Sequence, residues 1–204
     1  MGRREIRLFL KRPAALLVAA GMAPLAAGCA YFSRPEREFV SQADVLQAVA
    51  KTSGYTPSES AYRLRQAEVS SDMVTFYYQG ASRPGDRAWV IRFSTKNTEQ
   101  EPEDLVKIGK LIQAIRAGKD GFQEGAFGRR EVGDLIVEFM SYRFRSASRD
   151  DRGAPVTAAG IAAVTRVHAN PAPVVYHLNV VNMEGDEIPG WKEIEPLVEA
   201  IRQD

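Results

Sequence analysis

Residues 174–181 read VVYHLNVV, and residues 191–201 read WKEIEPLVEAI. The first stretch consists mostly of β-branched and aromatic residues and follows a proline-rich turn, which predicts a strand. In the second stretch the apolar residues recur at helical intervals and share one face: Trp191, Ile194, Leu197, Val198 and Ile201. Pro196 lies inside this helix, so it either opens the helix at its first turn or kinks it. The end of the chain therefore predicts a strand, a loop and a helix packed on a sheet.

Upstream of this unit, strands and helices alternate. Strands are expected near residues 62–65 and over residues 73–79, 88–95, 131–146, 160–169 and 173–183. A helix is predicted over residues 39–53, ended by Gly54 in a left-handed conformation, and a second helix carries an apolar stripe from Leu105 to Ile115. This order predicts a single α+β domain over residues 39–204, with a largely antiparallel sheet of about six strands packed by helices.

Two segments between these elements predict loops. Residues 118–130 contain four glycines, with Phe122 and Phe127 among them. A phosphate cradle needs a strand before the loop and a helix after it, and the order here is the reverse. The two phenylalanines are either packed into the core or displayed to a ligand or partner. Residues 146–155 are polar and mixed in charge, which predicts a second loop.

The first thirty residues carry a different signal. A basic head over residues 3–12 precedes an apolar run over residues 14–27, and this run ends at a cysteine, with the order Leu25, Ala26, Ala27, Gly28 and Cys29. This arrangement is typical of a secretory signal peptide. At about 1.5 Å per residue the apolar run spans roughly 21 Å as a helix, short of the ~30 Å hydrocarbon core. A permanent transmembrane helix is therefore the weaker interpretation.

The segment resembles a bacterial lipoprotein signal, in which small residues just before a cysteine are recognised by a dedicated peptidase after the thiol has been acylated. One position departs from that pattern, because Ala26 stands where a larger apolar residue is common. The resemblance implies that residues 1–28 are removed, that Cys29 carries the lipid and that residues 29–38 form a tether. The alternative is an ordinary signal peptide in which the cysteine is incidental.

Acylation of Cys29 implies residence at a membrane. Each buried methylene contributes about 0.8 kcal/mol, so two or three acyl chains hold a protein firmly on a bilayer. Ala30 follows the cysteine, where an aspartate would resemble the signal for retention in the inner membrane. The resemblance therefore favours a lipid-anchored protein of the bacterial cell envelope, on the periplasm-facing outer membrane rather than the inner membrane.

The composition narrows the classes of partner. The chain has 204 residues, 45% of them apolar and 26% charged, as is typical of a globular protein, and its single cysteine cannot form an internal disulfide. Without the predicted signal peptide, 22 basic and 25 acidic residues remain. This acidic balance lacks the basic bias of a nucleic-acid-binding protein, so no nucleic-acid partner is expected.

No catalytic or metal-binding motif is present in the sequence. His168 and His177 flank one predicted hairpin without a metal-binding spacing, and a metal site needs three or four ligands. We interpret both as surface or half-buried strand residues; a pair brought close across the hairpin would instead respond to pH. The serine-hydrolase patterns G-x-S-x-G and S-x-x-K are also missing. The sequence predicts a protein without a cofactor that is not an enzyme.

The order of elements and the closing strand, loop and helix resemble the PsbP/Mog1-type α/β/α sandwich over about residues 60–204. This family has no common active site, so the resemblance implies a binding or assembly role. A curved cystatin- or NTF2-like sheet wrapped on a helix is the alternative fold.

Two functions agree with these observations. The first is a membrane-anchored protein-interaction or assembly module that docks on another envelope protein through a sheet edge or the loops at residues 118–130 and 146–158. The second is a small-ligand or lipid-binding lipoprotein. It requires an apolar cavity of several hundred Å³ between the sheet and the Leu105 to Ile115 helix, with lining residues such as Trp89, Phe139 and Tyr176.

Overall fold

The computed structural model describes residues 38–55, 61–82, 85–96, 102–149, 152–168, 172–183 and 187–201. The predicted signal peptide and the lipidation position Cys29 lie outside these residues, as does the predicted tether up to residue 37. Glu38, which the sequence analysis assigned to the tether, begins the first strand.

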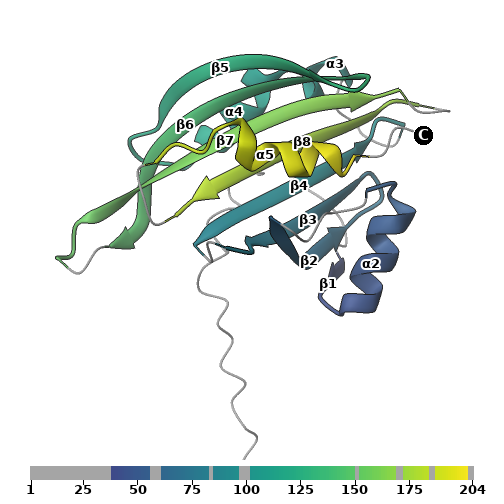
Figure 1. The fold of residues 1–204 in the computed structure, drawn as a ribbon, viewed down its shortest axis with the longest axis horizontal. Helices are drawn as coiled ribbons and strands as arrows, with labels where there is room; N and C mark the ends of the chain where they lie inside the picture. Colours follow the sequence, from purple (N-terminus) through teal and green to yellow (C-terminus); the bar gives the residue numbers. More distant parts are fainter. Residues whose placement is uncertain are drawn as a thin grey trace, which may run out of the picture.

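One antiparallel sheet of eight strands organises the described part of the chain, in the order β1-β2-β3-β4-β8-β7-β6-β5 (Figure 1). The strands are β1 (Glu38–Val40), β2 (Tyr62–Val69), β3 (Met73–Gly80), β4 (Asp86–Ser94), β5 (Gln123–Val132), β6 (Leu135–Arg149), β7 (Pro155–Val167) and β8 (Val174–Asn182). Strands β1 to β4 and β5 to β8 each form a meander. The two meanders meet where β4 pairs with β8.

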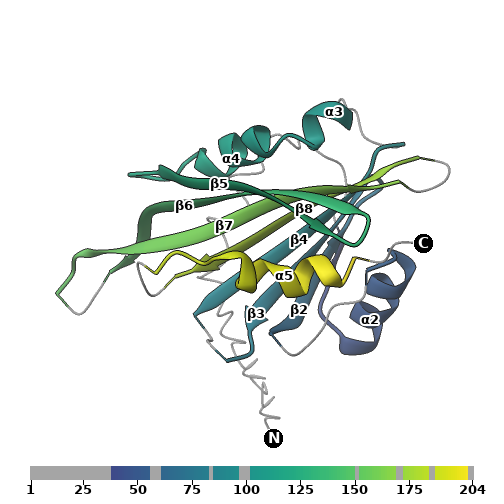
Figure 2. The ribbon, with the colours of Figure 1, turned by 45° about the horizontal axis from the view of Figure 1, so that its top comes forward.

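Helices cover both faces of the sheet. They are α2 (Ala43–Thr52), α3 (Pro102–Leu105), α4 (Ile108–Arg116) and α5 (Trp191–Glu199). Helices α2 and α5 contribute to the core on one face, and α3 and α4 to the core on the other (Figure 2). The predicted α+β class with a large antiparallel sheet is confirmed. The predicted number of about six strands is wrong, because β1 and β5 were missed.

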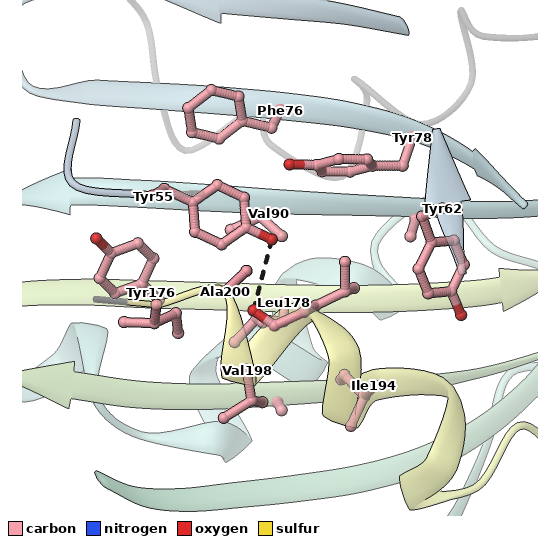
Figure 3. Packing of buried hydrophobic residues seen from close by; sticks show 14 of the residues in the cluster. Tyr55, Tyr62, Phe76, Tyr78, Val90, Tyr176, Leu178, Ile194, Val198 and Ala200 are labelled. Carbon is pink, nitrogen blue, oxygen red and sulfur yellow. Dashed lines mark hydrogen bonds between the residues drawn. The ribbon is translucent and has the colours of Figure 1, made fainter. Parts of the chain in front are cut away.

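The α5-side core is built around Tyr55, which is fully buried just after α2. Its ring stacks on Phe76 of β3 at 5.2 Å between centroids, and its hydroxyl donates a hydrogen bond to the carbonyl of Leu197 in α5 at 3.5 Å (Figure 3). The hydroxyl of Tyr62 in β2 donates to the carbonyl of Glu193 at 2.8 Å. These contacts join the last helix to the first half of the sheet. Pro196 lies inside α5 rather than at its first turn.

The α4-side core contains the predicted apolar stripe, but the single helix expected to carry it is interrupted at Val106 and Lys107, between α3 and α4. Five apolar side chains of α3 and α4 are buried there: Leu105, Ile108, Leu111, Ile112 and Ile115. They pack with residues of β4, β6, β7 and β8. Opposite them, the hydroxyl of Tyr142 donates a 2.7 Å hydrogen bond to Oδ1 of Asn179, so this core also contains a buried polar pair.

Strand β5 replaces most of the loop predicted at residues 118–130. Glycine usually indicates a loop, but two of these glycines make room for neighbouring side chains within the sheet. A Cβ at Gly128 would lie 2.2 Å from Cζ of Phe139, and a Cβ at Gly125 would lie 2.4 Å from Oγ of Ser141. These positions are therefore explained by close packing on β6.

Two other predicted boundaries are also wrong. The helix predicted over residues 39–53 is α2, which begins at Ala43, because Phe39 and Val40 pair with β2 as part of β1. Its predicted end is confirmed, since Gly54 has a φ of 68°. The loop predicted at residues 146–155 is strand at its two ends: β6 continues to Arg149 and β7 begins at Pro155. This hairpin projects beyond the rest of the sheet (Figure 1).

Candidate functional site

The sheet is left partly uncovered where β5 and β6 form its edge. On the face that carries α4, Phe127 lies opposite Met140 in the strand register, and Arg129 lies opposite Glu138. Ile136 is on the same face, because side chains alternate along a strand and Met140 packs against the α4-side core. We call Phe127, Arg129, Ile136, Glu138 and Met140 the open strip. Its two most exposed apolar side chains are Phe127, at 57%, and Ile136, at 47%.

The composition of the open strip is mixed along its length. The pair Phe127 and Met140 is apolar, the next pair is Arg129 and Glu138, and Ile136 follows. The two charged side chains are neighbours in register, but no ion pair joins them in the described part of the chain. Alternating apolar and charged groups on one exposed surface are suited to binding a protein, which can bury the former and pair with the latter.

A pocket of about 250 Å³ adjoins the open strip at the start of β6. Its lining is formed by Val106, Asp134, Ile136, Glu138, Val164, Thr165, Arg166 and His168. Ile136 and Glu138 belong to both the pocket and the strip. The lining thus combines aliphatic side chains with two acids, one arginine and one histidine.

The structure separates the two phenylalanines that the sequence grouped in one loop. Phe122 is half-buried and stacks on Tyr142 at 5.3 Å between ring centroids. The guanidinium carbon of Arg116 lies 5.4 Å from the centroid of the Phe122 ring. Phe127 is displayed on β5. Of the two alternatives, core packing applies to Phe122 and exposure applies to Phe127. The prediction that Phe127 lies in a loop is wrong, because it lies within strand β5.

The two histidines do not form a pair. In the register of β7 and β8, His177 lies opposite Val164. His168 is four positions further along β7 and beyond its end, so the two histidines are not opposite one another. It is buried, and its Nε2 donates a hydrogen bond to the carbonyl of Leu105 at 2.6 Å. Burial lowers the pKa of His177 to about 4, and the bond to Leu105 opposes this only in part. His168 is exposed and lines the pocket. The expectation that both are surface or half-buried therefore fails for His177.

The apolar cavity expected of a carrier is not formed by the residues predicted to line it. Trp89 packs against the α4-side core, whereas Phe139 and Tyr176 belong to the α5-side core on the opposite face. The sheet itself separates them. Sequence periodicity placed each residue on a strand, but it did not reveal which face of the sheet each side chain occupies.

The charged and aliphatic residues of the open strip were missed by the sequence analysis. Strand 131–146 has apolar residues at both alternating positions, which indicated partial cover on both faces without showing where the cover ends. Ile136 lines the pocket together with Val106, which lies between α3 and α4, and it remains 47% exposed there. No local sequence signal carries that information.

Within the described residues, no group of three or more histidine, cysteine, aspartate or glutamate side chains could hold a metal ion. Over the same residues, no helix has the length and apolarity needed to cross a bilayer.

Comparisons with known proteins name no family for this chain. No protein-family model matches it, and no curated protein matches it. Among solved structures, the chain is similar to human StAR-related lipid transfer protein 5, at 11% sequence identity, over 78% of this chain and 91% of that one, with a TM-score of 0.28.

Proposed function

We propose that the chain is a lipid-anchored interaction domain of the bacterial cell envelope, in which the open strip and the β5 edge bind another envelope protein. In this proposal Cys29 carries the acyl chains, and Ala30 directs the protein to the outer membrane. The domain has a binding or assembly role rather than a catalytic one. The sequence of residues 1–29 supports the location, and the geometry of the open strip supports the role.

The exposure of Phe127 and Ile136 is the observation that carries the proposal. Large apolar side chains on a sheet face are normally covered, and α4 covers the same face over β7 and part of β6. The open strip is bordered by β5, an edge strand whose backbone can pair with an extended segment of a partner. The predicted docking features, a sheet edge and the segment at residues 118–130, coincide in β5.

The pocket favours a second candidate function, the binding of a small ligand. Its volume of about 250 Å³ is below the roughly 300 to 1,000 Å³ of typical ligand pockets. Four of its lining residues are ionisable, so a small polar molecule suits it better than a lipid chain. Because the pocket shares Ile136 and Glu138 with the open strip, it also suits a single side chain of a protein partner.

We propose a PsbP/Mog1-type α/β/α sandwich as the specific fold. Helices on both faces of the described sheet support this assignment over a cystatin- or NTF2-like sheet wrapped on one helix. The two successive meanders, each followed by a helix that packs on the sheet, agree with the order of elements on which the resemblance rests.

Site-specific photocrosslinking in the native host tests the interaction proposal. A photoreactive amino acid replaces Phe127 or Ile136, and the matched control replaces Ile188, which is 36% exposed in the segment before α5. We expect both strip positions to capture one and the same envelope protein and the control position not to capture it. The proposal is wrong if the strip positions give no specific product, or if Ile188 captures the same protein equally well. Native mass spectrometry of the purified protein tests the ligand alternative, which requires a bound small molecule.

A further inference from the structure

The two edges of the sheet differ in their distance along the chain from the proposed lipid anchor. Strand β1 begins at Glu38, and residues 30–37 separate it from Cys29. A fully extended segment of that length spans at most about 30 Å. At about 4.8 Å per strand the eight-stranded sheet is roughly 34 Å wide, and β5 forms its far edge (Figure 1). The tether therefore limits the β1 edge to within about 30 Å of the anchored cysteine, whereas the β5 edge can lie a further sheet width away.

The β1 edge displays an aromatic side chain and two arginines. Phe39 is 61% exposed. It lies opposite Glu68 in β2, and Arg63 of the same strand lies opposite Gln79 in β3. Glu68 lies opposite Thr75 of β3, and Thr75 is four positions from Gln79, so their side chains are on the same face. These registers therefore place Phe39 and Arg63 on one face of the sheet.

The two arginines lie in the part of β2 that β1 does not cover. Strand β1 pairs only with Ala67 to Val69, so Arg63 and Arg65 are at the edge themselves, and both are exposed. No acidic side chain of the described residues pairs with either arginine. Glu38 lies opposite Val69, which places its side chain on the face away from Phe39.

We infer that the β1 edge is the membrane-contact surface of the anchored domain, with Phe39 in the interfacial region of the bilayer and Arg63 and Arg65 at the phosphates of anionic lipids. The inference rests on the proposed lipid anchor. Aromatic rings favour the membrane interface, and each basic side chain is attracted to an anionic surface. One ring and two arginines bind weakly by themselves. A short tether makes the contact intramolecular, which raises the effective concentration of bilayer at this edge.

A nitroxide label at Ser41 measures this contact while leaving Phe39 intact. Ser41 is exposed just after β1, and Glu131, exposed on β5, provides the matched position at the other edge. Acylation consumes the single native thiol, so Ser41→Cys or Glu131→Cys supplies the only reactive one. The full-length acylated protein is reconstituted in vesicles of phosphatidylethanolamine and phosphatidylglycerol. Intact mass and flotation first establish the anchor. Collision of the label with a water-soluble nickel complex is then compared with its collision with oxygen.

We expect the nickel accessibility at position 41 to be about fivefold lower than at position 131, because the interface excludes the charged complex. Phe39→Ser should raise the accessibility at position 41, whereas Phe127→Ser should not. Arg63→Gln with Arg65→Gln, or vesicles of phosphatidylcholine alone, should weaken the protection.

Two results would overturn the inference in different ways. Equal accessibility at both positions in a protein that floats with vesicles rejects the membrane-contact surface while the anchor stands, and so does protection that survives Phe39→Ser and both arginine changes. A protein without acyl mass that does not float rejects the anchor and the inference together.

Discussion

The imidazole of His177 and the carbonyl of Leu105 are joined by a 2.6 Å hydrogen bond beneath the turn between α3 and α4. The ring of Phe93 lies at 4.7 Å from the imidazole, edge to face, and the site is buried. A neutral imidazole fits this environment. A charged one would lose its hydration, and no acidic side chain of the described residues pairs with it.

This contact predicts loss of stability in acid. The folded-state pKa of His177, about 4, lies below its ordinary value of 6.5, so the unfolded chain takes up the proton first. The free energy of unfolding should therefore be unaffected above pH 6.5 and should fall as the pH decreases towards 4. The full loss is about 3 kcal/mol. Urea unfolding of the wild type and His177→Gln at pH 7.5 and 4.5 checks this. An equal acid loss in both proteins would assign the effect to other groups.

The packing of Phe139 on Gly128 predicts a destabilising substitution. Gly128→Ala places a Cβ 2.2 Å from the Phe139 ring, so we expect it to lower the free energy of unfolding by about 1 to 3 kcal/mol. Gly109→Ala in α4 is the matched control, because within the described residues no atom other than the adjacent helix backbone would lie within 4 Å of its Cβ. That change should be neutral or stabilising by up to about 1 kcal/mol. Thermal unfolding of both variants measures the contrast, and equal effects would contradict the packing explanation.

The buried pair of Tyr142 and Asn179 predicts a non-additive double variant. Tyr142→Phe leaves Oδ1 of Asn179 buried without its donor, which should cost about 1 to 3 kcal/mol of stability. Replacing both partners, with Tyr142→Phe and Asn179→Leu, should recover part of that loss, because no buried acceptor remains. Chemical denaturation of the two single variants and the double variant gives the coupling energy. Simple additivity would show that the hydrogen bond contributes little.

The proposed lipid anchor predicts a change of processing on a single substitution. The peptidase that the resemblance implies acts after acylation, and Cys29→Ala removes the only thiol that can be acylated. The variant should therefore keep residues 1–28 and lack the acyl mass, whereas the wild type should begin at an acylated Cys29. Intact mass of both proteins from the native host measures this. A wild type without acyl mass, or the same amino terminus in both proteins, would contradict acylation as the means of attachment.

Sequence periodicity was sufficient for the elements whose apolar residues are nearly all buried. The stripe from Leu105 to Ile115 and the run VVYHLNVV both lie in the core as expected, because a helical or β-branched pattern reports burial directly. Strand β5 was missed because the role of Gly128 depends on Phe139 of the neighbouring strand, which local sequence does not reveal. The open strip was missed for a similar reason: whether a helix covers a strand face depends on tertiary packing, which the local sequence of β5 and β6 does not reveal.

The pairing of β4 with β8 has a consequence for how the chain reaches its native state. Residues 86–94 hydrogen-bond with residues 174–182, and Tyr55 meets α5 and forms a bridge to Ile201. Strands β1 to β4 therefore lack β8 as a neighbour, and the aromatic core around Tyr55 lacks helix α5, until nearly all of the chain has been synthesised. Contacts between such distant segments slow folding. The native packing of the amino-terminal half of the sheet is thus completed only after residues 174–201 have been synthesised.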